Sequence, residues 1–215
     1  MRNLMYKEFK LCVHLTSYLF LPLAAMLLIP NYPYYVSFFY QTLAIFFLFL
    51  NGNTNNDVTF TTLLPIRKRD AVKARLLTVV ILESLQIIVS IPFAVQRNIL
   101  ISAENAAGME ANFALFGLVL VMYGLFNLVF LPAFYKTAYR TGTPYLLACT
   151  AMTLFVVAAE LAVNLVPGWK AALDTVQPVS LLPQLAVLAV GVSLFALLTW
   201  LSYTQSVKNF EQLDL

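Results

Sequence analysis

Six long runs of apolar residues divide this chain, and they constrain its fold more than any other feature of the sequence. The runs extend over about residues 13–30, 34–50, 76–95, 112–131, 144–166 and 183–204. Each approaches the roughly 20 residues that an α-helix needs to cross the hydrocarbon core of a bilayer. Because lipid offers the backbone no hydrogen-bond partners, runs of this length must be helical. The sequence therefore predicts an all-α polytopic membrane protein, with a single transmembrane domain of six spans over residues 1–215.

Composition and missing motifs exclude most other classes. Only 11% of the residues are charged and 61% are hydrophobic, whereas a soluble domain usually carries about 25% charged residues. The chain has no GxxxxGK[ST] phosphate loop and no HExxH zinc motif, and its two cysteines and single histidine are too few for a zinc site. We therefore predict that the chain is not an enzyme and binds no cofactor or metal itself.

Lysine and arginine predict the orientation of the six spans. With an even number of spans, both termini lie on the same side as the loops that follow spans two and four. Eleven of the 13 basic residues fall on that side, and only Arg97 and Lys170 fall on the other. Basic residues collect on the cytoplasmic side of membrane proteins, so both termini are predicted to be cytoplasmic.

Prolines give further local expectations. Pro22 and Pro92 lie inside predicted spans, where proline kinks a helix. Pro132 should end the fourth span, because proline cannot continue the hydrogen-bond ladder. Pro144 and Pro183 stand where a first helical turn tolerates proline.

One polar, basic segment interrupts the apolar chain, the stretch "NNDVTFTTLLPIRKRDAVKARLL" from Asn55 to Leu77. Asp57 is a predicted helix N-cap, and Pro65 should stop the short helix that follows. A second helix then restarts with basic residues on one side and runs into span three. Val58, Phe60, Leu63 and Leu64 are expected to form an apolar surface outside the bilayer, while Arg67, Lys68, Arg69, Lys73 and Arg75 are expected to face anionic lipid headgroups.

Two interpretations of this segment stay open at the level of sequence. In one, it is an ordinary basic loop that anchors two spans. In the other, its apolar residues dock into a groove of a cytoplasmic partner. A nucleic-acid partner is not predicted, since the basic run is short and both its ends enter the membrane; lipid headgroups are the nearer partner.

Polar side chains within the spans are the remaining candidates for function, because an ionisable group there costs about 2.5–3.5 kcal/mol on insertion scales. Each is expected either to line a translocation path or to bond one helix to another. Glu83 and Gln86 share a face of span three, and Glu160 and Asn164 share a face of span five. Gln41 on span two and Asn127 on span four complete the set.

The segment 55–77 resembles the first cytoplasmic loop of small bacterial ABC-transporter permeases of the type-2 exporter class. "LPAFYKTAYRTG" (131–142) resembles the segment after the family's fourth span, and "MRNLMYKEFKL" (1–11) its N-terminal amphipathic helix. The resemblance covers nearly the whole chain in span order. In the first loop it is carried by Asp57, Phe60, Leu64, Pro65, Arg69, Asp70, Val72, Ala74 and Arg75.

This resemblance implies a permease subunit in the bacterial cytoplasmic membrane, paired with a second permease chain as a homodimer or heterodimer. It also implies a separate ATP-binding subunit that holds ATP and Mg, and a coupling helix between spans two and three. The expected cargo is a peptide, an antimicrobial or another small amphipathic molecule. The alternatives are a stand-alone secondary transporter or channel, and a membrane immunity or scaffold protein without transport.

Overall fold

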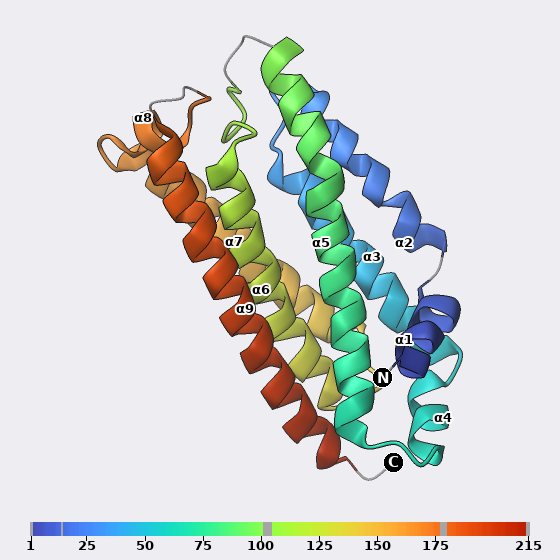
Figure 1. The fold of residues 1–215 in the computed structure, drawn as a ribbon. Coiled ribbons are helices and arrows are strands. Elements are labelled where there is room, and N and C mark those ends of the chain that lie inside the picture. Colours follow the sequence, from blue (N-terminus) through green and yellow to red (C-terminus); the bar gives the residue numbers. More distant parts are fainter. Residues whose placement is uncertain (1, 14, 101–104, 177–179, 214–215) are drawn as a thin grey trace.

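The computed structural model describes residues 2–13, 15–100, 105–176 and 180–213, and all the regular structure in these ranges is helical (Figure 1). Five helices are long and apolar enough to cross a membrane. They are α3 (Tyr35–Thr54), α5 (Lys68–Leu100), α6 (Phe113–Tyr135), α7 (Gly142–Leu165) and α9 (Leu181–Glu211). The predicted all-α membrane fold is therefore confirmed, with five of its six spans.

The predicted first span, residues 13–30, is not one α-helix. It consists of α2 (Leu15–Leu19) followed by the 3₁₀ helix η2 (Leu21–Leu28), which carries Pro22 in its first turn. Proline has no N–H for the α-helical ladder, so Pro22 interrupts this span instead of merely bending it. η2 packs against α5 and α3. A sixth crossing of the membrane stays a prediction.

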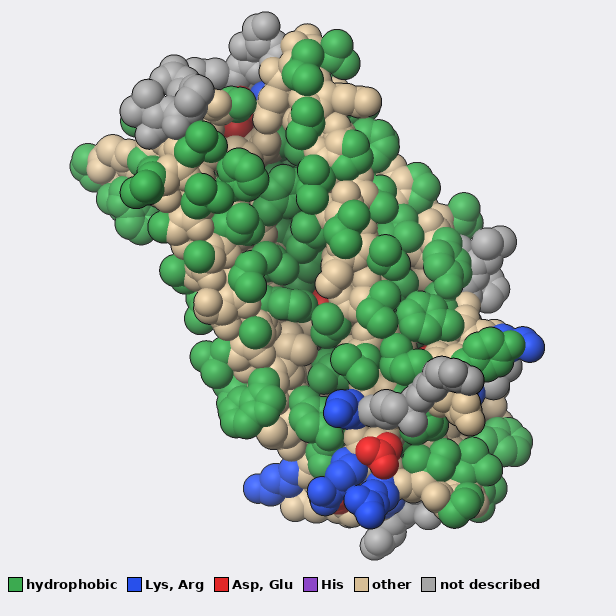
Figure 2. All heavy atoms as spheres, in the orientation of Figure 1, with side chains coloured by type: hydrophobic (Ala, Val, Ile, Leu, Met, Phe, Trp, Pro, Cys, Tyr) green, Lys and Arg blue, Asp and Glu red, His purple; other side chains and the backbone are tan. Residues whose placement is uncertain are grey.

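Short helices gather at one end of the molecule. α1 (Arg2–Lys7) continues into the π-helix η1 (Glu8–Cys12), and α4 (Asp57–Leu63) follows α3. Figure 1 shows α1 and α4 at the same end as the C-terminus of α9. We call this the basic end, because Figure 2 shows Lys and Arg side chains gathered there below a mostly hydrophobic surface. The opposite end holds the segment 105–112 and the short helix α8 (Trp169–Leu173).

The prolines behave in two ways. Pro144 and Pro183 stand in the first turns of α7 and α9, as predicted. Pro132 does not end α6, which continues to Tyr135; a proline removes only one ladder bond, and the last turn packs its aromatic side chains into the core. Pro92 lies inside the continuous helix α5.

Helix α6 is the centre of the bundle and packs against both α7 and α9. At its basic half, the rings of Phe130 and Phe134 meet Phe49 of α3 edge-on, with ring centroids 4.9 and 4.7 Å apart. At its other half, α6 and α9 touch through glycines: a Cβ on Gly191 would lie 2.2 Å from the carbonyl oxygen of Gly117. Small residues permit this close approach of helix backbones, which is typical of packing in membranes.

Candidate functional site

Helix α4 presents an apolar surface to solvent at the basic end. Phe60 is 64% exposed and Leu63 76% exposed, and Leu64 ends the helix in an extended conformation at 50% exposure. Pro65 follows it and is also exposed. Val58 is only partly buried and packs against the core. The short helix and its proline stop are thus as the sequence predicted.

Behind this apolar surface, α4 is held by a buried cluster of charges. The Arg75 guanidinium, from the second turn of α5, forms ion pairs with the carboxylates of Asp57 and Glu8. Lys7 Nζ lies 2.7 Å from Asp57 Oδ1 and 2.8 Å from the hydroxyl of Thr61. The N-terminal segment, α4 and α5 therefore meet at one point, which we call the charge cluster (Lys7, Glu8, Asp57 and Arg75).

The charge cluster also contacts the end of α3, through Arg75. The Arg75 guanidinium lies over the ring of Phe49, 5.2 Å from its centroid, in a cation–π contact. A Cβ on Gly52 would lie 3.0 Å from Arg75 Nη1, so glycine lets the guanidinium lie close against the α3 backbone, and a larger residue would require it to shift. The charge cluster therefore joins α4 to both α3 and α5.

Two sequence expectations need correction here. The N-cap of α4 is Asn56, in a left-handed conformation, and Asp57 is the first helical residue. Arg75 was expected to face headgroups but is 4% exposed, because its position on α5 points toward Glu8 and Asp57. Arg69 does lie on the surface, paired with Glu211 at 3.2 Å, and Asp70 is half-buried in the first turn of α5.

The intramembrane polar residues fall into two separate groups. Glu83 and Asn127 meet across α5 and α6, where the Asn127 amide donates to the Glu83 carboxylate at 2.9 Å. Gln86 donates to the Ser37 carbonyl of α3 at 3.5 Å, and Gln41 is fully buried. The bonds of Glu83, Asn127 and Gln86 thus join α3, α5 and α6 inside the bundle, with Gln41 buried in α3.

Glu160 and Asn164 lie elsewhere, in the half of α7 near the opposite end. The Glu160 carboxylate accepts the backbone N–H of Met109 at 3.1 Å. The Asn164 amide donates to the Glu160 carbonyl at 2.8 Å along the same helix. Glu160 therefore helps to hold the segment 105–112.

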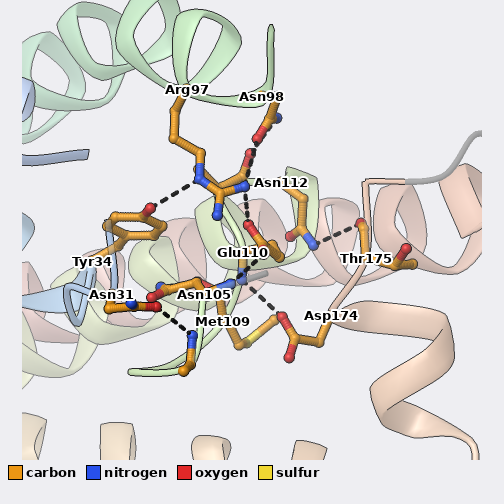
Figure 3. A network of polar contacts seen from close by, with 12 residues as sticks. Asn31, Tyr34, Arg97, Asn98, Asn105, Met109, Glu110, Asn112, Asp174 and Thr175 are labelled. Carbon is orange, nitrogen blue, oxygen red and sulfur yellow. Dashed lines mark hydrogen bonds and ion pairs between the residues drawn. The ribbon is translucent and has the colours of Figure 1, made fainter. Parts of the chain in front are cut away.

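This segment is the centre of a polar network that the sequence did not reveal (Figure 3). Glu110 pairs with the buried Arg97 of α5, which also donates to the Tyr34 hydroxyl at 3.0 Å. The Glu110 N–H donates to Asp174 at 2.8 Å, and Asn105 donates to the Tyr32 carbonyl. The segment therefore fastens the ends of α3, α5, α7 and α8 together.

An apolar cavity of about 320 Å³ lies near the opposite end, between α5 and α9 and against α6. Its walls are mostly aliphatic and aromatic, with amide side chains at the end near the segment 105–112. They include Ile87, Ile91, Phe116 and Leu188, followed by Asn98, Asn112 and Gln184. The volume is at the lower limit of known small-molecule sites, and the lining suits an amphipathic molecule.

Residues 3–211 match the family model described as ABC-2 family transporter protein. The chain belongs to this family. No curated protein and no solved structure matches it. The match spans nearly the whole chain and confirms the resemblance noted in the sequence, so the protein is an ABC-2 type permease, a membrane transport subunit and not itself catalytic.

In this permease, the residues predicted for coupling divide into two sets. Phe60, Leu63, Leu64 and Pro65 lie on the surface, where another protein can reach them. Asp57 and Arg75 are buried and contact the permease's own helices. Lys7 and Glu8 belong with the second set, although sequence reasoning counted Lys7 only as a basic residue near the membrane. A lone acid between Lys7 and Lys10 was the available signal that this segment has an internal partner.

Proposed function

We propose that the permease is the membrane-spanning subunit of an ATP-driven exporter in the bacterial cytoplasmic membrane, and that α4 is its coupling helix. The observation that carries the proposal is the two-sided structure of α4. Its outer side exposes Phe60, Leu63 and Leu64, and its inner side is fixed to α1, α3 and α5 through the charge cluster. A partner that pushes on the apolar side moves the spans behind it.

The partner is a separate ATP-binding subunit, which holds ATP and Mg on the cytoplasmic side. An exposed aromatic and two leucines at the basic end suit a groove on such a subunit. A second permease chain, identical or related, completes the translocation path. The apolar cavity with its amide end supports a small amphipathic cargo.

The coupling role predicts the behaviour of a double variant, Phe60→Ala with Leu64→Ala. Burying a Phe or Leu side chain contributes about 1.5–3 kcal/mol, and about 1.4 kcal/mol is tenfold in affinity. We expect the variant to insert normally but to bind the ATP-binding subunit at least about tenfold more weakly. Affinity measured between purified subunits, together with ATP-driven export, checks this.

Leu182→Ala with Leu185→Ala is the matched control, since these exposed leucines lie at the start of α9, at the opposite end. It should leave the affinity for the ATP-binding subunit unchanged. Normal affinity and export in the Phe60/Leu64 variant would remove the coupling role and leave segment 55–77 as an anchoring loop.

Orientation is tested separately by labelling with a membrane-impermeant thiol reagent, in a background where Cys12 and Cys149 are replaced by serine. Lys73 at the basic end and Lys170 at the opposite end are both exposed. We expect the Lys170→Cys variant to react in intact cells and the Lys73→Cys variant to react only after permeabilisation. The reverse pattern would place the basic end outside and end the coupling proposal.

A further inference from the structure

Glu83 is an acid in the middle of a spanning helix without a basic partner. Its side chain is 1% exposed, and one carboxylate oxygen accepts the Asn127 amide. Within the part of the chain that the structure describes, no lysine or arginine lies within ion-pair distance of it. A bare carboxylate in a medium of low dielectric constant is very unfavourable, so its charge has to be neutralised by something else.

One amide side chain bonds this carboxylate, and helix geometry places two more near it. Asn127 reaches it from α6, and Gln86 lies one turn farther along α5, opposite Ser37 of α3. Because α3 and α5 run in opposite directions, one turn toward the basic end on both helices brings Gln41 level with Glu83. We call these four residues the midplane cluster (Gln41, Glu83, Gln86 and Asn127); all of them are 0–1% exposed.

The midplane cluster holds five buried polar atoms that have no hydrogen-bond partner. Four are oxygens, one on each of its residues, and the fifth is the amide nitrogen of Gln41. Buried polar groups are nearly always bonded, because leaving one unsatisfied destabilises the fold. What the cluster lacks is therefore positive charge or hydrogen-bond donors to face four inward oxygens.

We propose that the midplane cluster binds one small monovalent cation, a proton or a sodium ion, with Glu83 as the anionic ligand. Oxygen atoms of carboxylates and amides are the donor set that hard cations prefer. One carboxylate balances one positive charge, whereas a divalent ion would leave a net charge inside the bilayer. A proton satisfies the same requirement, because the neutral carboxyl group becomes a donor to a neighbouring amide oxygen.

Helix α5 carries further polar side chains on the same buried face as this cluster. They are Arg75, Thr78, Ser90 and Arg97. Arg75 is paired with Asp57 and Glu8 at the basic end, so its positive charge is balanced there and does not neutralise Glu83.

The groups that face Glu83 are few, which makes the site simple to test. Tyr123 of α6 is the titratable neighbour among the described residues, while α3 and α5 present Gln41 and Gln86. The nearest charges are those of the charge cluster, two helical turns away on α5, and of Arg97 with Glu110 near the opposite end. Replacing Glu83 removes the ion-binding charge without disturbing an ion pair.

The experiment measures the melting temperature of the permease alone in lipid nanodiscs, comparing wild type with Glu83→Gln. One arm varies pH at constant sodium, and the other replaces sodium by choline at constant pH and ionic strength. Bound ion stabilises the folded state in proportion to the logarithm of its concentration. We expect the melting temperature of the wild type to fall by roughly 3–5 °C for each tenfold decrease in the concentration of the ion. The melting temperature of Glu83→Gln should not depend on that concentration.

Loss of the ion weakens the wild type in either case, and the arm that responds identifies the ion. If the ion is a proton, wild type weakens relative to Glu83→Gln as pH rises, and infrared spectra of the wild type show the carbonyl stretch of a protonated carboxyl group that the variant lacks. If it is sodium, wild type weakens on replacement by choline. Glu211→Gln, which alters an exposed carboxylate, should follow the wild type in both arms. Equal responses of wild type and Glu83→Gln in both arms overturn the proposal.

Gln41→Leu keeps the test decisive if Glu83→Gln does not fold. Both amide atoms of Gln41 lack partners in the described structure. If no ion binds at Gln41, Gln41→Leu should stabilise the protein under all conditions and leave its ion dependence equal to that of the wild type. That result would contradict the proposed ion site. If Gln41 is a ligand, leucine shifts the midpoint of the ion dependence by about tenfold or more. These measurements use the permease alone, so they are independent of coupling to an ATP-binding subunit.

Discussion

Alanine at position 191 is expected to lower the melting temperature of the permease by roughly 3–10 °C. The added Cβ would lie 2.2 Å from the carbonyl oxygen of Gly117 and 2.7 Å from its Cα. Because the obstacle is backbone and not a flexible side chain, α9 must move away from α6 along their contact. Overpacking of this kind costs about 1–3 kcal/mol, occasionally more, and 1 kcal/mol shifts the melting temperature of a chain of this size by about 2–4 °C.

Gly142→Ala is the control for this substitution. Gly142 begins α7, and a Cβ there would meet nothing within 4 Å. Alanine favours a helix over glycine by about 1 kcal/mol, so this variant should be neutral or slightly more stable. Thermal unfolding in nanodiscs compares the two. A Gly191→Ala protein as stable as Gly142→Ala would show that α6 and α9 are not in backbone contact.

Removing the charge of Arg75 should have the second large effect. Arg75→Gln leaves only Lys7 to balance the two buried carboxylates of Glu8 and Asp57, and breaking a buried ion pair costs about 3–5 kcal/mol. We expect α4 to detach from the spans, to become sensitive to protease in inverted vesicles, and to lose coupling to ATP hydrolysis. Lys73→Gln, an exposed charge two residues earlier, should change none of these.

A neutral replacement of Glu8, Asp57 and Arg75, which leaves the more exposed Lys7 in place, separates charge from packing. The triple variant Glu8→Gln, Asp57→Asn and Arg75→Gln removes the stranded charges together, and buried ion pairs are often replaceable by neutral groups at small cost. Its stability should exceed that of Arg75→Gln alone. If the triple variant is less stable than the single one, the Arg75 effect comes from lost contacts with Phe49 and Gly52 and not from uncompensated charge.

The sequence was sufficient to predict most elements whose cause is local. Apolar runs of span length located the five long helices, and Pro65 correctly ended α4. The start of α5 in the basic stretch agrees with the prediction, but two predicted spans end too early: α5 continues to Leu100 and α9 to Glu211. Hydropathy reports where lipid begins, whereas these helices continue into water, where polar residues extend them.

Features that depend on distant partners could not be predicted. From the sequence alone, Arg75 is one more basic residue of a loop. Only the fold places Glu8 and Asp57 beside it. Glu110 and Asn105 look like ordinary loop residues, and only the fold brings them to Arg97 and Tyr32. The failure at Pro22 is different: the sequence predicts that this proline bends the first span, whereas the structure has a break between two short helices.

The positions of the charge cluster along the chain set the order in which the protein is assembled during synthesis. Its members end at residue 75, so the N-terminal segment, α3, α4 and the start of α5 can lock together while the rest of the chain is still being made. Helix α6 cannot do the same. Its Gly117 surface has no partner until residue 191 has been synthesised, which makes the docking of α9 against α6 a late step of assembly.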